Sequence, residues 1–215
     1  METLFDAVIF DLDGTLLDTL DDIRDSLNHT LRLFGLPEQG REDVRRHLGN
    51  GSARLVELSV DGGRANPLYP QVLEAYSQWY DAHANLKTRP YPGMPEAIRQ
   101  LTDLGVKVAI VSNKPDAAVQ TLNDSYFRVN VAVGERPGVR RKPAPDAVLA
   151  ALERLGAAPD RAVYVGDSEV DLMTAGNAGL PCVCVSWGFR DREQLAEAGA
   201  ACIADDAEAL LALLI

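Results

Sequence analysis

The sequence predicts an α/β protein whose core is a doubly wound, Rossmann-like parallel sheet, interrupted by an inserted α-helical domain. Two observations lead to this fold class. Short apolar runs alternate with helical patterns through most of the chain, which is typical of a parallel sheet covered by helices on both faces. Between residues 16 and 87 no such run occurs, and the hydrophobic period is helical. We therefore expect residues 1–15 and 88–215 to form the core and residues 16–87 to form the insert.

The elements follow from these patterns in chain order. Strands are expected at the short apolar runs Ala7–Phe10, Val106–Val111, Val129–Val133, Ala162–Val165 and Cys182–Val185. Helices of the insert are expected at Thr19–Phe34, Arg41–Leu48 and Pro70–Ala84, and a glycine follows the first two as a stop signal. The stretch from Gly134 to Lys142 is expected to form a basic, turn-rich loop.

Composition narrows the classes of function. The chain has 215 residues, 47% hydrophobic and 25% charged, which is enough to bury a large core. Its net charge of −11 argues against a nucleic-acid partner or an acidic membrane partner, because both bind basic surfaces. No signal peptide or membrane span is expected near the amino terminus, so we expect a cytoplasmic protein. Cysteines and histidines show no metal-site spacing, and Cys182 and Cys184 are expected to be core thiols.

Two aspartates mark the first candidate site. Asp11 and Asp13 directly follow the strand expected at Ala7–Phe10, and Gly14 then allows a turn. At the carboxyl end of a strand in an open α/β sheet, side chains point into the crevice where such folds bind ligands. Two carboxylates there favour a hard divalent cation such as Mg²⁺. An Asp-x-Asp-Gly sequence also occurs as an ordinary turn, so this motif alone does not establish a site.

Further polar groups of the kind that phosphate chemistry needs follow later runs or loops: Ser112, Lys142, Asp167 and Asp171. Each has an ordinary explanation by itself, as a helix cap, a first-turn acid or a solvated loop charge. Their joint order with the first two aspartates favours the functional interpretation. For Asp18 we keep the structural interpretation, as a cap of the helix that follows.

The four segments together resemble the motifs of the haloacid dehalogenase-like hydrolases. The matching stretches are Asp11-x-Asp13-Gly14-Thr15-Leu16-x-Asp18, Val111-Ser112-Asn113-Lys114-Pro115, Lys142-Pro143-x-Pro145-Asp146 and Gly166-Asp167-Ser168-x-x-Asp171, and they span nearly the whole chain. Within that superfamily, the Asn113-Lys114-Pro115 run, the stretch Thr174–Gly179 and Trp187-Gly188-Phe189 look most like the phosphoglycolate phosphatase branch.

The resemblance implies an Mg²⁺-dependent phosphatase acting on a small phosphorylated metabolite, with 2-phosphoglycolate as the lead. Asp11 would attack phosphorus and form an aspartyl-phosphate, which splits one hard displacement into two easier ones. Asp13 would move the proton, while Ser112 and Lys142 would bind the phosphate. By the same analogy, the metal would be held by Asp11, Asp13 and Asp167, with Asp171 as a further acidic support.

The insert corresponds to the mobile cap of the superfamily, where we expect specificity to be decided. Arg54, in the loop expected at Gly49–Arg54 between cap helices, could contact a substrate carboxylate, or it could be a solvated arginine. Asn113 and Lys114 are further candidates for substrate binding. The oligomeric state is expected to be a monomer or a homodimer.

Other functions stay open at this point. A sugar phosphomutase, a pyrophosphatase or a nucleotidase of the same superfamily would share the aspartate chemistry. The dehalogenase branch lacks the second aspartate of the first motif, and phosphonate hydrolysis needs a cap lysine, which residues 15–86 do not contain. A noncatalytic phosphate-binding or regulatory module is the alternative of another class, because fold does not imply function.

Overall fold

The computed structural model describes residues 3–215, and the chain divides into two compact units. One unit consists of the chain up to Leu17 together with Pro90–Ile215, and the other is Asp18–Arg89. The expected insert, residues 16–87, begins and ends two residues earlier than the second unit. Within the described residues, no helix is long and apolar enough to cross a membrane.

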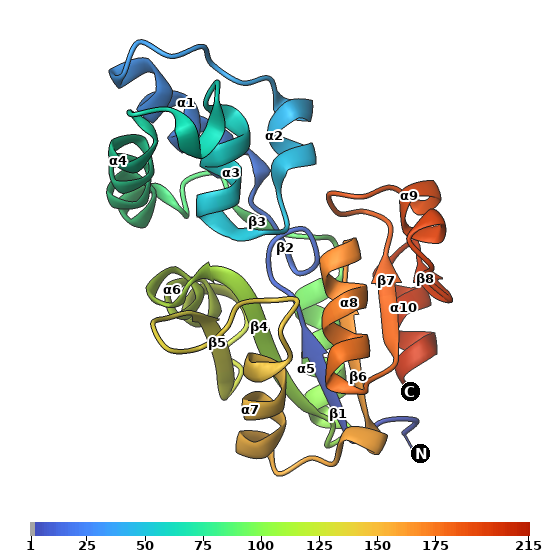
Figure 1. Cartoon of the computed structure of the whole chain (residues 1–215). Helices are drawn as coiled ribbons and strands as arrows, with labels where there is room; N and C mark the ends of the chain where they lie inside the picture. The colour runs from blue at the N-terminus through green and yellow to red at the C-terminus, as the bar shows by residue number, and fades with distance from the viewer. Residues whose placement is uncertain (1–2) are drawn as a thin grey trace. The chain divides into compact units, whose positions relative to one another are not determined.

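The first unit is built on a six-stranded sheet in which every pair of neighbouring strands is parallel (Figure 1). In spatial order its strands are β5 (Val131–Glu135), β4 (Lys107–Pro115), β1 (Ala7–Phe10), β6 (Ala162–Gly166), β7 (Cys182–Val185) and β8 (Cys202–Ala204). The chain adds β4 and β5 on one side of β1, and then β6, β7 and β8 on the other. The order therefore reverses at β1, which makes the carboxyl end of that strand the expected ligand site.

Both faces of this sheet are covered, so its strands are buried on both sides. Val8 and Phe10 of β1 belong to a core cluster that includes side chains of α5 (Met94–Asp103), α6 (Asp116–Tyr126) and α10 (Ala207–Leu214). Ala7 and Ile9 belong to a second cluster with α7 (Asp146–Leu155) and α8 (Glu169–Ala178). Successive strand residues point to opposite faces, which explains why the strand sequences are continuously apolar. The predicted doubly wound α/β core is confirmed.

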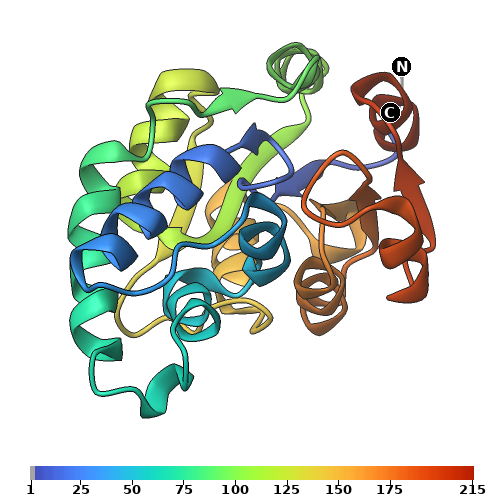
Figure 2. The ribbon, with the colours of Figure 1, turned by 90° about the horizontal axis from the view of Figure 1, so that it is seen from above.

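The second unit is helical. Its elements are α1 (Leu20–Leu33), α2 (Arg41–His47), α3 (Gly51–Ser59), a 3₁₀ turn η1 (Gly63–Ala65) and α4 (Tyr69–His83), and α1 packs against α4 (Figure 2). The connections at its two ends contain the short paired strands β2 (Leu17–Asp18) and β3 (Arg89–Pro90). Within this unit the buried Asp22 carboxylate accepts the backbone N–H groups of Leu86, Lys87 and Thr88, so it fixes the last segment of the unit.

The remaining elements of the first unit are a 3₁₀ turn η2 (Pro159–Arg161) and α9 (Arg192–Glu197). The sequence prediction differed from the structure at several places. Helix α3 begins at Gly51, so the loop predicted at Gly49–Arg54 is wrong for its last four residues, and Arg54 is helical. Strand β4 continues to Pro115 instead of ending at Val111, with a shift of register between these two residues. The short edge strand β8 and helix α10 were not predicted.

Candidate active site

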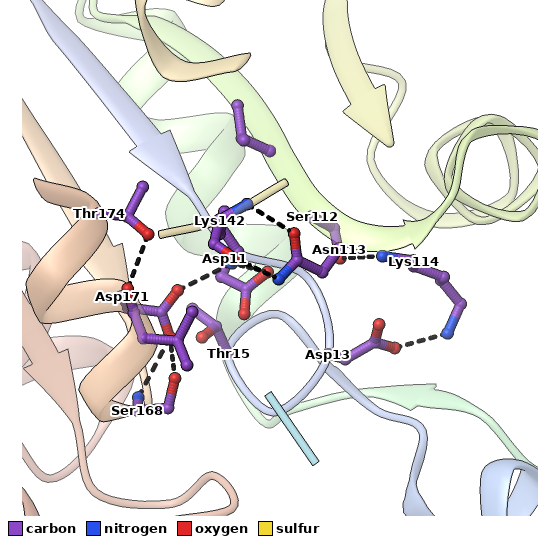
Figure 3. Close-up of polar contacts among 12 residues, drawn as sticks. Asp11, Asp13, Thr15, Ser112, Asn113, Lys114, Lys142, Ser168, Asp171 and Thr174 are labelled. Atoms are coloured by element: carbon purple, nitrogen blue, oxygen red, sulfur yellow. Dashed lines mark hydrogen bonds and ion pairs between the residues drawn. The ribbon is translucent and has the colours of Figure 1, made fainter. Parts of the chain in front are cut away.

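The sheet register brings the candidate residues of the first unit to one edge. Phe10 at the end of β1 is paired with Ile110 of β4 on one side and Val165 of β6 on the other. The residue after it, Asp11, donates its backbone N–H to the Val165 carbonyl at 2.8 Å. Side chains that follow the three strands therefore meet, as Figure 3 shows for the groups around Asp11.

The Lys142 ammonium lies at the centre of these groups. Its Nζ atom is 2.8 Å from Asp11 Oδ1, 2.8 Å from Asp171 Oδ1 and 3.0 Å from the Tyr164 hydroxyl. Burial by itself would lower the Lys142 pKa, but the charges of Asp11 and Asp171 outweigh burial and hold the pKa well above its ordinary value. The lysine is therefore a permanent cation in a buried site.

Asp171 holds both the lysine and the start of helix α8. Its Oδ1 atom accepts Lys142 Nζ and the Tyr164 hydroxyl, and its Oδ2 atom accepts the backbone N–H groups of Asp167 and Ser168 and the Ser168 hydroxyl. Ser168 is the N-cap, and Asp171, three residues later, completes a capping box. The protein itself thus supplies five donors to this fully buried carboxylate.

Asp167 is held by groups that are distant in sequence. Thr15 Oγ1 donates to its Oδ1 atom at 3.0 Å, and the Phe189 N–H donates to its Oδ2 atom at 2.7 Å. Trp187 Nε1 in turn donates to the Thr15 carbonyl at 3.0 Å. Gly188 packs so closely that a Cβ atom there would overlap with the Asp167 side chain. Burial is the main reason that the Asp167 pKa stands well above its ordinary value.

These residues fit a metal ion. Carboxylate oxygens of Asp11, Asp167 and Asp171 lie within 4.8 Å of one another, and all three residues are buried. Within residues 3–215, Asp11 Oδ1 accepts no hydrogen bond besides its ion pair with Lys142. Burial raises the pKa of Asp11 to about 7, with Asp171 and Asp13 adding to the rise and Lys142 opposing it. A hard cation with oxygen ligands would relieve the repulsion among these carboxylates.

The candidates for substrate binding, Ser112, Asn113 and Lys114, lie at the end of β4. The candidate for acid–base chemistry, Asp13, lies in the chain shortly after β1. Lys114 Nζ donates to Asp13 Oδ1 at 2.6 Å, and the lysine side chain is only 2% exposed. The Asn113 amide accepts the Lys142 backbone N–H at 2.8 Å and donates to the Lys142 carbonyl at 3.1 Å. Asn113 therefore fixes the backbone of the central lysine. The buried Ser112 hydroxyl accepts the Lys114 N–H at 3.2 Å.

Arg54 belongs to the second unit and is described there by itself. It lies in α3, pairs with Glu57 at 3.1 Å, and its side chain is 45% exposed. Three contributors to the first unit's site were not predicted: the Tyr164 hydroxyl, the Thr15 hydroxyl and the Phe189 backbone N–H. Thr15 and Trp187-Gly188-Phe189 were already part of the family resemblance, and this was their only signal in the sequence. From the sequence pattern, Tyr164 is expected to be an ordinary core residue of an apolar strand.

Comparison with known proteins agrees with this geometry. The family model for haloacid dehalogenase-like hydrolases matches residues 8–185. The phosphoglycolate phosphatase of Pseudomonas putida is 33% identical over 97% of this chain and 79% of its own length. The crystal structure of a proposed phosphoglycolate phosphatase from Lactobacillus delbrueckii subsp. bulgaricus is 36% identical, with a TM-score of 0.91 over 98% of both chains. CbbY from Rhodobacter sphaeroides, in complex with phosphate, is 25% identical with a TM-score of 0.78 over 94% of this chain and 95% of its own.

Proposed function

Because the chain belongs to the haloacid dehalogenase-like hydrolases, we propose that it is an Mg²⁺-dependent phosphatase that hydrolyses a small phosphate monoester, 2-phosphoglycolate, through an aspartyl-phosphate. The observation that carries the proposal is the buried Asp11 carboxylate beside the Lys142 ammonium, at the point where the strand order reverses. Phosphoryl transfer needs a positioned nucleophile and fixed positive charge against the phosphate oxygens. This pair supplies both.

In the first step, an Asp11 carboxylate oxygen forms a bond to phosphorus while the bond from phosphorus to the ester oxygen breaks. Asp13 gives its proton to that leaving oxygen. In the second step Asp13 takes a proton from water, whose oxygen attacks phosphorus and releases Asp11. Lys142 stabilises the charge on the phosphate oxygens in both steps, and Ser112 binds the same oxygens.

A bound Mg²⁺ would supply further positive charge to the phosphate, and Asp11, Asp167 and the main-chain carbonyl of Asp13 would hold it. Asp171 would act as an acidic support through Lys142, because its oxygens already accept five donors. The Asp11 Oδ1 atom, with no hydrogen bond besides its ion pair within residues 3–215, supports this ligand set.

The substrate assignment rests on the names of the relatives and on the candidate groups for a carboxylate. Arg54 would bind the carboxylate of 2-phosphoglycolate. Its ion pair with Glu57 is partly exposed, and surface ion pairs contribute only about 0–1 kcal/mol, so a substrate could displace it at low cost. Asn113 and Lys114 would act at the same site by holding Lys142 and Asp13. We place the enzyme in the cytoplasm, as a monomer or a homodimer.

The test is phosphate release from 2-phosphoglycolate, hexose phosphates, nucleoside monophosphates and pyrophosphate, each with Mg²⁺ and with a chelator. We expect Mg²⁺-dependent release that is fastest with 2-phosphoglycolate and absent in Asp11→Asn. The exposed Asp160→Asn is the matched control and should keep full activity. Isomerisation of a hexose phosphate without phosphate release would replace the proposal by a phosphomutase. Activity that survives chelation would contradict the metal requirement.

A further inference from the structure

The side chains of strand β6 are apolar with one exception. The strand Ala162–Gly166 is fully buried, and among its side chains only Tyr164 carries a polar atom. A buried hydroxyl is costly unless it is hydrogen-bonded, and phenylalanine would fill the same space without that cost. We therefore expect the Tyr164 hydroxyl to have hydrogen-bond partners, which a phenylalanine ring could not bind.

Those partners are the charged groups of the site. The Tyr164 hydroxyl accepts Lys142 Nζ at 3.0 Å, and its own proton faces Asp171 Oδ1 at 3.2 Å and the Val111 carbonyl at 3.4 Å. The ring lies in the core cluster beneath the site, together with Ile9 and Val111. A residue that the sequence places in the core thus reaches Lys142 and Asp171, two charged groups of the site.

The hydrogen bonds of the Lys142 ammonium show what the Tyr164 hydroxyl contributes. An ammonium group has three N–H donors. Within residues 3–215 the Lys142 ammonium donates to Asp171 Oδ1 at 2.8 Å and to the Tyr164 hydroxyl at 3.0 Å, while Asp11 Oδ1 lies 2.8 Å away as an ion pair. Without the Tyr164 hydroxyl, only Asp171 would accept a hydrogen bond from the ammonium within residues 3–215, and a single hydrogen bond holds its direction less firmly than two. The Tyr164 hydroxyl is also uncharged, since a phenol is neutral near pH 7, so it orients the cation without adding a negative charge beside a phosphate site.

We propose that Tyr164 is a positioning residue that fixes the direction of the Lys142 ammonium toward the phosphate. It touches neither the reacting atoms nor the metal ligands Asp11 and Asp167 in the contacts described above. Its effect on turnover rests on the proposed function, whereas its effect on the lysine does not. Tyr164→Phe removes one oxygen and keeps the ring in the core, so it isolates the contact.

The first readout is the ¹⁵N signal of the Lys142 ammonium in protein labelled at lysine. The chain has four lysines, Lys87, Lys107, Lys114 and Lys142, so the spectrum is simple, and Lys142→Arg identifies the signal. We expect the Lys142 signal of Tyr164→Phe to shift and its protons to exchange with water at least tenfold faster. Tyr126→Phe, a half-buried tyrosine at the end of α6, is the matched control and should change neither.

The second readout is steady-state kinetics with 2-phosphoglycolate and Mg²⁺. Misplacing a catalytic group by less than an ångström costs roughly 10- to 100-fold, so kcat should fall in that range while KM changes by less than about threefold. An unchanged lysine signal overturns the proposal, as does a shifted signal with unchanged kcat in an active wild type. If the wild type shows no phosphatase activity, the proposed function fails, and the lysine signal during titration with inorganic phosphate decides the role of Tyr164: an equal response in wild type and Tyr164→Phe overturns it.

Discussion

Replacing Asp11 by asparagine should make the metal-free protein more stable at neutral pH. Burial raises the pKa of Asp11 from its ordinary 3.8 to about 7 in the folded state. Between these values the folded protein keeps a proton that the unfolded chain has released. The free energy of unfolding of the wild type therefore falls as the pH rises through this window, and the loss is complete above pH 7. Asparagine carries no such proton and escapes the loss.

The magnitude follows from the shift. A rise of about three pKa units corresponds to about 4 kcal/mol, at roughly 1.4 kcal/mol per unit. Relative to wild type, Asp11→Asn should gain stability between pH 4 and pH 8, by up to this amount. At pH 4, where the wild-type carboxyl is protonated, the two proteins should be close in stability. Removing the proposed nucleophile would thus stabilise the fold, which is the usual trade-off between activity and stability.

Urea unfolding in the presence of a chelator, at several values between pH 4 and pH 8, measures this difference. Asp160→Asn serves as the control and should follow the wild type at each pH. Adding Mg²⁺ at pH 8 should stabilise the wild type more than Asp11→Asn, because a ligand that binds the folded state raises its stability. Parallel curves for wild type and Asp11→Asn without metal would refute the reasoning, and so would a wild type that gains on the variant as the pH rises.

Three further substitutions test other contacts. Gly188→Ala should lower Mg²⁺ affinity by about 10- to 100-fold in calorimetry, because its Cβ would overlap with the side chain of Asp167, the proposed metal ligand, whereas Gly176→Ala, with open space around it, should leave affinity unchanged. Asn113→Ala removes two hydrogen bonds to the backbone of the central lysine, and kcat should fall by roughly 10-fold or more; an unchanged kcat would contradict its positioning role. Asp22→Ala removes the acceptor of three consecutive backbone N–H groups and should cost about 3 kcal/mol or more in urea unfolding. Asp21→Ala, which removes only a half-exposed carboxylate with two surface ion pairs, should cost less than about 1 kcal/mol.

The core sheet could be predicted because its strands are buried on both faces. A strand such as Ala7–Phe10 then reads as a continuous apolar run, and the polar residue after it marks the carboxyl end. The same reasoning failed for β8, a three-residue edge strand with one exposed cysteine that leaves too short a pattern. It also failed for α3, where Gly49, Asn50 and Gly51 favour a turn but Leu55 and Val56 are buried in the helical unit.

Less of the candidate site than of the core sheet could be predicted from the sequence. Lys142 lies at the end of a loop and does not directly follow a strand. Its position beside Asp11 depends on two hydrogen bonds with Asn113, which no local pattern indicates. The Phe189 contribution is a backbone N–H, which every residue except proline possesses, so no choice of amino acid reveals it. The family resemblance supplied what periodicity could not. The roles assigned to these residues stay predictions until the variants are measured.

The close approach of glycines to the site has a consequence for how such an enzyme can be altered. A Cβ atom at Gly166 would overlap with the Asp171 side chain, as one at Gly188 would with Asp167. Glycine is the smallest amino acid, so every replacement at either position adds side-chain atoms where none fit. If all amino acids are introduced at these two positions, we expect every active variant to keep glycine there. In a laboratory selection for activity on a new substrate, we therefore expect the beneficial substitutions at residues that do not contact the site carboxylates.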